Sequence, residues 1–310
     1  MNKSQYRSLS KRGFVKINNF INENDYPLNL SSSLIKKKNK FNGVIENIPH
    51  KHIIKIQKKI KSLVIKLNQY GKFKLDTKNF NYAAIYVNPK KNVTKLNKPF
   101  DVNRDPKSNS NGSLNWHLDH YSYYFYRNHK NYLIMYLPIL KKNINFSNLG
   151  IIPLDILKKK DIKTFKRTKN RGALRFRQVE ADTITWFEQR FKSKIKVGEW
   201  YAIDDYYENA GWKIKLNLEK NKVVPKLRKN DLLIMRADVI HKTNDAKIKR
   251  LSIRCDAIPK NYIVPSSWLG FWKFFILFPF LKPKVKYNMK KYIGEFLIRK
   301  INTFKRIILT

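Results

Sequence analysis

The chain has 310 residues, and its 66 Lys and Arg against 22 Asp and Glu give a formal charge of +44. Hydrophobic residues make up 42% and aromatic residues 14%, too much for a disordered basic tail. The single cysteine, Cys255, excludes an intrachain disulfide scaffold and a cysteine-rich zinc module. No apolar run reaches the roughly 18 residues of a membrane-spanning helix, and no secretory signal is visible, so we expect a cytoplasmic protein.

The basic excess has two interpretations. Of the 66 basic residues 51 are Lys and 15 are Arg, whereas specific phosphate and base recognition relies on arginine. Abundant Lys, Asn, Ile, Phe and Tyr are typical of an AT-rich genome, in which the charge is drift in surface composition. The alternative is an anionic partner: nucleic acid, a membrane surface or a phosphorylated substrate. No nucleic-acid-binding motif is visible, and the charge alone does not choose between these interpretations.

The first predicted elements in chain order are a strand and two helix signals. Residues 12–21 alternate in hydropathy and are followed by Asn-Glu-Asn-Asp at 22–25, which indicates a short strand and then a helix start. Residues 51–69 carry apolar side chains at three- and four-residue steps with lysines between them, which predicts an amphipathic helix. Gly71 is expected to end that helix.

From residue 80 to residue 258 the pattern changes to short β-branched or aromatic runs separated by polar turns. The predicted strands lie at 82–87, 132–137, 183–187, 232–235 and 251–254. Short strands without long helices between them favour an antiparallel sandwich or barrel.

Two stretches between these strands stand apart by composition. Residues 101–113 are expected to form a loop, and residues 150–200 to form a basic insertion. The insertion contains Lys158 to Lys160 and an arginine cluster between 167 and 177. These cations either form a solvated face or collect an anionic substrate at the mouth of a site.

The C-terminal tail differs from the rest of the chain. Residues 268–281 are dense in aromatic side chains, and residues 288–308 predict a helix with one apolar and one basic face. This tail either covers the fold as an extension or holds the chain at a membrane surface through 268–308. We therefore expect one domain over 1–260 and an aromatic and basic helical extension over 261–310.

Two short motifs carry side chains that can bind a metal. In Trp116-His117-Leu118-Asp119, a strand places His117 and Asp119 on the same face, because positions i and i+2 point the same way. His241 follows an apolar strand through a short turn. Two imidazoles and one carboxylate form the facial triad of non-haem Fe(II) oxygenases, which leaves sites open for a bidentate co-substrate and O₂.

A 2-oxoglutarate co-substrate also needs a cation for its second carboxylate. Arg250 comes nine residues after His241 and can grip a carboxylate bidentately. Ser252, two residues further on, presents its hydroxyl on the same face of the strand. Arg254 is the alternative cation on that face, and the serine favours Arg250.

In these motifs the sequence resembles the Fe(II)/2-oxoglutarate-dependent dioxygenases, most of all their phytanoyl-CoA dioxygenase-like branch. The matching pieces are Gly13 to Ile17, Trp116 to Asp119, and Asp231 to Ile234 followed by His241 and by Arg250 to Ser252. The resemblance implies a mostly β fold with flanking helices (α+β), in which N-terminal helices accompany a double-stranded β-helix, or jelly-roll, core.

The resemblance also implies a site and a reaction. The Fe(II) ligands fall on His117, Asp119 and His241, and the 2-oxoglutarate anchor falls on Arg250, assisted by Ser252. Asp119 stands where halogenating relatives have a small residue, so hydroxylation is expected. The substrate is expected to be small or lipid-like, with an anionic one as an option. The alternative is a basic nucleic-acid- or membrane-binding protein with a vestigial jelly roll, which would bind neither iron nor 2-oxoglutarate.

Overall fold

A computed structural model of the chain describes residues 1–31, 34, 43–46, 48, 50–87, 115–118, 131–169, 174–204, 211–244 and 247–260. They fall in one compact unit, made of residues 1–205 and 209–260. Three predictions lie outside the described residues: Asp119, the loop at 101–113, and the tail with its membrane contact through 268–308. No helix in the described ranges is long and apolar enough to cross a membrane.

Six strands of the described chain form the larger sheet, in the order β1-β9-β4-β11-β3-β2, and every neighbouring pair is antiparallel. The strands of this sheet are β1 Phe14–Ile17, β2 Gly43–Glu46, β3 Leu75–Val87, β4 Leu133–Lys141, β9 Leu232–Arg236 and β11 Arg250–Pro259. Four of the predicted strands fall in β3, β4, β9 and β11 and are confirmed. The predicted strand at 12–21 is confirmed as β1 and is followed by a single 3₁₀ turn, Glu23–Asp25.

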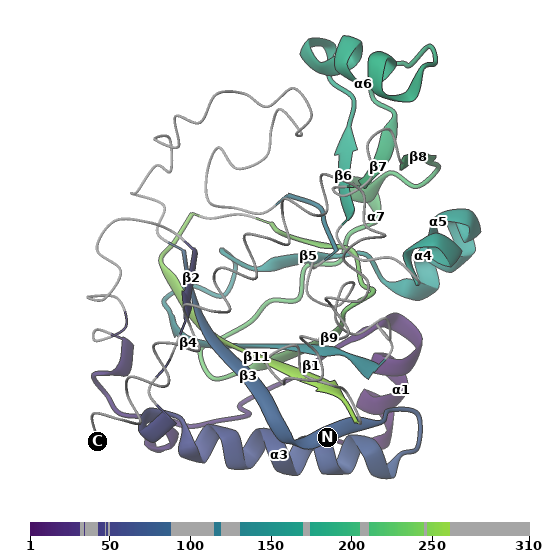
Figure 1. The fold of residues 1–310 in the computed structure, drawn as a ribbon. Helices are drawn as coiled ribbons and strands as arrows, with labels where there is room; N and C mark the ends of the chain where they lie inside the picture. The colour runs from purple at the N-terminus through teal and green to yellow at the C-terminus, as the bar shows by residue number, and fades with distance from the viewer. Residues whose placement is uncertain are drawn as a thin grey trace, which may run out of the picture. The chain divides into compact units, whose positions relative to one another are not determined.

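Helices α1 (Lys3–Arg12) and α3 (Ile54–Gln69) lie on one face of this sheet (Figure 1). Buried side chains of both helices share one hydrophobic cluster with alternate residues of β11, namely Leu251, Ile253 and Cys255. Because neighbouring strand residues point to opposite faces, Arg250 and Ser252 lie on the face turned away from these helices. The alternation in β11 therefore separates an apolar, helix-covered face from a face that carries the polar side chains.

The second set of strands is β5 Leu149–Ile151, β6 Leu174–Gln178, β7 Trp200–Asp204, β8 Gly211–Ile214 and β10 His241–Thr243. β10 pairs with β5, and β6-β7-β8 form a three-stranded sheet. Residues 116–118 join the two groups, because His117 pairs with His241 on one side and with Arg175 on the other. Antiparallel sheets flanked by helices agree with the expected mostly β fold with flanking helices, and the jelly-roll topology stays a prediction.

The strand predicted at 183–187 is wrong. These residues form the end of a 3₁₀ turn, Ala181–Thr183, and the start of helix α6, Ile184–Phe191. The apolar residues Ile184, Phe187 and Phe191 recur at helical spacing, and Phe187 is buried against Tyr201 and Ile203 of β7. The remaining helices of the described chain are α4 Leu154–Lys160, α5 Ile162–Thr168 and α7 Leu218–Asn221.

Gly13 ends α1 in the left-handed region at φ 83°, and a Cβ there would lie 2.5 Å from Val239 and 2.7 Å from Leu154. Gly71, after α3, has φ 82° but open space around the same position. Both Gly→Ala changes incur the left-handed penalty, but only Gly13→Ala adds overpacking of about 1–3 kcal/mol. Gly13→Ala should therefore melt roughly 2–10 °C below Gly71→Ala in thermal unfolding. Equal melting temperatures would contradict this packing.

Candidate metal and co-substrate site

His117 and His241 lie side by side on adjacent strands. The backbone N–H of each donates to the carbonyl oxygen of the other, at 3.0 and 3.2 Å, so they form a hydrogen-bonded antiparallel pair. Their ring centres are 4.3 Å apart and the planes are tilted by 51°. The fold thus brings together two histidines that are 124 residues apart in the sequence.

Each imidazole is held by a backbone carbonyl two residues before it. Nδ1 of His117 lies 2.6 Å from the carbonyl oxygen of Asn115, and Nδ1 of His241 lies 3.0 Å from that of Val239. A carbonyl only accepts, so Nδ1 carries the proton in both rings, and in the neutral imidazole Nε2 is then the nitrogen with the lone pair. Carbonyl partners of this kind orient metal-binding histidines.

The spacing of the rings also suits a shared metal ion. When two imidazoles bind one metal ion through Nε2, with metal–nitrogen distances of about 2.1 Å and a right angle between the two bonds, their ring centres are roughly 4.5 Å apart. The observed 4.3 Å is close to that separation. The donor set of His117 and His241 therefore fits a transition metal.

Asp119, the third predicted ligand, lies outside the described residues. Within the ranges that the structure describes, no group of three His, Cys, Asp or Glu side chains is placed to hold a metal. The carboxylate of the triad stays a prediction from the His-x-Asp spacing.

Arg250 and Ser252 are both buried, with 4% and 1% of their surfaces exposed. Nη1 of Arg250 donates to the carbonyl oxygen of Ser147 at 2.6 Å. The hydroxyl of Ser252 has no hydrogen-bond partner among the described residues. Buried polar groups are normally paired, so an orphaned hydroxyl two residues from a buried guanidinium fits a bound polar ligand.

Arg254, the alternative cation, takes part in a structural ion pair. Its Nε donates to Oδ1 of Asp256 at 2.8 Å and its Nη2 to Oδ2 at 3.2 Å. The hydroxyl of Tyr132 donates to the same carboxylate at 2.6 Å. Arg254 therefore neutralises a carboxylate of its own strand, which favours Arg250 as the co-substrate cation.

Lys141 is a buried cation that the sequence analysis did not single out. It lies opposite Arg250 across the β4–β11 pair, and the register shifts between Leu251 and Ser252. That irregularity turns Lys141 to the face of Arg250, although Leu137 and Ile139 of the same strand face the helices. Two cations thus lie beside each other at this end of the sheet.

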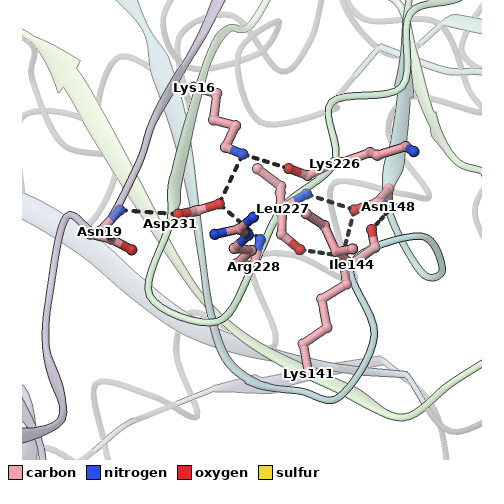
Figure 2. Close-up of polar contacts among 9 residues, drawn as sticks. All are labelled: Lys16, Asn19, Lys141, Ile144, Asn148, Lys226, Leu227, Arg228 and Asp231. Carbon is pink, nitrogen blue, oxygen red and sulfur yellow. Dashed lines mark hydrogen bonds and ion pairs between the residues drawn. The ribbon is translucent and has the colours of Figure 1, made fainter.

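The ammonium of Lys141 is anchored by neutral oxygens (Figure 2). Its Nζ donates to Oδ1 of Asn148 at 2.5 Å and to the carbonyl oxygen of Leu227 at 2.7 Å. Asn148 is fully buried, and its carbonyl oxygen accepts from the backbone N–H of Asn244 at 2.9 Å. Because Asn244 follows the strand of His241, Asn148 ties the buried cations to the histidine strand.

Asp231 fixes the neighbouring loop. It is 1% exposed, and its carboxylate binds Nζ of Lys16 at 3.0 Å and the backbone N–H groups of Asn19 and Arg228 at 3.0 and 2.8 Å (Figure 2). Asp231 begins one of the sequence pieces, Asp231 to Ile234, in which the chain resembles the dioxygenases. Its role here is to join β1 to the turn that precedes β9.

Glu219 supports the segment that carries His117. Its carboxylate accepts from Nε1 of Trp116 at 2.7 Å, from Lys242 at 2.5 Å and from Lys222 at 2.7 Å. Burial by itself raises the pKa of Glu219, but these hydrogen bonds and the charge of Lys242 outweigh it and lower the pKa from 4.5 to about 2.

This pKa shift predicts a pH-dependent stability term. Because the folded-state pKa of Glu219 is depressed, its stabilisation is complete above about pH 4.5 and is lost as the pH falls toward 2. Glu219→Gln should therefore melt below the natural chain at pH 7, and the gap should narrow as the pH is lowered through this window. Melting curves of both chains between pH 3 and pH 7 measure the gap, and a constant gap would contradict the assignment.

No protein-family model and no curated protein matches the chain. Solved structures similar to it include EvdO2 from Micromonospora carbonacea var. aurantiaca, at 9% identity and a TM-score of 0.48, covering 85% of this chain and 94% of that one. A Pseudomonas putida prolyl-4-hydroxylase has 11% identity and a TM-score of 0.41, covering 83% of this chain and 98% of that one. HygX from Streptomyces hygroscopicus has 10% identity and a TM-score of 0.40, covering 84% and 88%.

Two of these proteins are described with 2-oxoglutarate or a metal bound. EvdO2 is also described in complex with 2-oxoglutarate, and HygX with nickel and 2-oxoglutarate or with iron. The finer resemblance to the phytanoyl-CoA dioxygenase-like branch stays a prediction.

Proposed function

We propose that the chain is an Fe(II)- and 2-oxoglutarate-dependent dioxygenase that hydroxylates a small or lipid-like substrate. The observation that carries the proposal is the pair of neighbouring imidazoles, His117 and His241, with both Nδ1 atoms held by backbone carbonyls. This arrangement makes Nε2 the nitrogen of each neutral ring that can bind a metal ion.

Two sets of residues would bind the two ligands, iron and 2-oxoglutarate. His117, His241 and the predicted Asp119 would hold the iron. Arg250 and Ser252 would hold the distal carboxylate of 2-oxoglutarate, with Lys141 adding positive charge beside Arg250. When bound, iron and 2-oxoglutarate supply the O₂ chemistry that side chains lack: substrate C–H, O₂ and 2-oxoglutarate become C–OH, succinate and CO₂.

The protein's own contribution is binding, orientation and exclusion of water. Arg250 is almost fully buried, and a charge-assisted hydrogen bond is stronger where water is excluded. Asn148 fixes the spacing between the cations and the histidine strand through its bonds to Lys141 and Asn244. The co-substrate would thereby be held at a set distance from the two imidazoles.

From the sequence, we also propose that the chain belongs to the phytanoyl-CoA dioxygenase-like branch. Its catalytic domain would cover residues 1–260, and the tail over 261–310 would cover the fold or contact a membrane surface.

Anaerobic titration of the full chain with Fe(II) and then with 2-oxoglutarate tests the proposal. Both are expected to bind, and succinate should form on admission of O₂, fastest with the correct member of a panel of acyl thioesters, lipids and sugars. Failure to bind either ligand would instead support the alternative, a basic binding protein with a vestigial jelly roll.

A further inference from the structure

Arg175 lies next to the histidine pair in one row across the sheet. The row runs Ile151, His241, His117, Arg175, Ile203, Gly211, each residue directly opposite the next on the neighbouring strand. Residues opposed in this way point to the same face of a sheet. The guanidinium of Arg175 therefore extends from the face that carries both imidazoles.

Arg175 and His117 form the type of antiparallel pair in which the two side chains lie closer together. Hydrogen bonds from Leu118 to Leu174 (2.8 Å) and from Phe176 to Trp116 (2.9 Å) flank the two residues, so they form a non-hydrogen-bonded antiparallel pair. In such pairs the Cβ atoms are about 4.5–5.5 Å apart, and the side chains lie closer together than in a hydrogen-bonded pair.

Beyond Arg175 the row is apolar and covered. Ile203 is 2% exposed and packs in the cluster that includes Phe187 of α6. A Cβ on Gly211 would lie 2.7 Å from the ring of Phe191, so α6 covers that end of the row. Within the described strands, half-buried Arg175 is therefore the side chain of the row that lies between the two imidazoles and these apolar residues.

We propose that Arg175 is the substrate-binding residue of this site and that it takes an anionic group, a carboxylate or a phosphate ester. The inference rests on the proposed function and adds a substrate class to it. An arginine binds both kinds of oxyanion through its planar fork. Since Arg175 adjoins a metal-binding histidine, the oxidised carbon would lie within a few bonds of the acid group.

Arg177 offers a matched control. It lies two residues further along β6, on the same face, and its Nη1 donates to the carbonyl oxygen of Phe176 at 3.0 Å. It lies opposite Tyr201, two residues along both strands from the Arg175–Ile203 pair, and is therefore outside the row that contains the histidines. Arg177→Gln removes the same charge as Arg175→Gln from the same strand, so a general effect of charge changes both variants equally.

The test is calorimetric titration of the full chain, loaded anaerobically with Fe(II) and 2-oxoglutarate, with octanoate, octyl phosphate and 1-octanol. Salt at 0.15 M screens the exposed lysines over about 8 Å. We expect at least one acid to bind about tenfold or more tightly than the alcohol. Arg175→Gln should lose this preference, Arg175→Lys should keep part of it, and Arg177→Gln should keep it in full. Comparison of the two acids distinguishes a carboxylate from a phosphate ester.

Any of the following results would overturn the inference: equal binding of acids and alcohol, an unchanged preference in Arg175→Gln, or an equal loss in Arg177→Gln. A weakened affinity of Arg175→Gln for Fe(II) would also overturn it, because Arg175 would then serve the metal site. If the natural chain binds neither Fe(II) nor 2-oxoglutarate, the proposed function fails. The same titrations on the unloaded chain then still decide whether Arg175 selects anions.

Discussion

His241→Ala is expected to abolish Fe(II)-dependent turnover of 2-oxoglutarate while the chain stays folded. Loss of a residue that merely orients a metal ligand typically costs about 10–100-fold in affinity or activity, so loss of a ligand should cost at least that. His241 is 2% exposed and starts β10, whose pairing with β5 is made by backbone groups and does not need the imidazole. The variant should therefore lose iron but keep its sheet.

Succinate formation, anaerobic Fe(II) titration and thermal unfolding measure these effects separately. His52→Ala is the control, because His52 ends a 3₁₀ turn beside α3, the helix on the apolar face of the larger sheet. It should keep both iron and turnover. Full turnover in His241→Ala would remove the metal assignment, whatever the control does.

Arg250→Ala should raise the 2-oxoglutarate requirement far more than Arg254→Ala. Losing a buried charge-assisted contact costs about 2–5 kcal/mol, or roughly 30- to several-thousand-fold in co-substrate affinity. Arg250 reaches Ser147 on the polar face, near the orphaned hydroxyl of Ser252. Arg254 already binds Asp256 through two nitrogens.

The two variants should differ in the kind of damage as well as in its size. Arg254→Ala leaves Asp256 buried without its guanidinium, so it should lower the melting temperature with little change in co-substrate affinity. Equilibrium binding of 2-oxoglutarate and thermal unfolding of both variants give the comparison. A larger loss of affinity in Arg254→Ala would mean that the co-substrate carboxylate is held further along β11 than proposed.

Local patterns in the sequence determined much of the fold. The strands β3, β4, β9 and β11 and the helix α3 follow from apolar spacing, because a half-buried element must turn one face to the core. Apolar spacing does not predict helix α1, because only Tyr6 and Leu9 are buried, and the expectation of N-terminal helices rests on the family resemblance. Its local signals are the Asn2–Gln5 capping box and Gly13. The segment predicted as a strand at 183–187 is a helix because Phe191 extends the apolar spacing of Ile184 and Phe187 to i, i+3 and i+7.

For the site, the sequence by itself determined the candidate residues and their order: His117, Asp119, His241, Arg250 and Ser252. Residue type and a two-residue spacing are enough to name donors that share a face of one strand. Ser252 favours Arg250 over Arg254 in the sequence alone, and the fold adds the ion pair of Arg254 with Asp256, which depends on the side-chain conformation.

Only the tertiary structure placed Lys141 beside Arg250 and Arg175 beside His117. Lys141 reaches the polar face through an irregularity in strand register, and a one-residue shift changes the face of every side chain beyond it. Arg175 reaches the site because His117 pairs with His241 across 124 residues of sequence and with Arg175 across 58. Long-range pairing of this kind is set by how whole sheets assemble and leaves no local pattern to read.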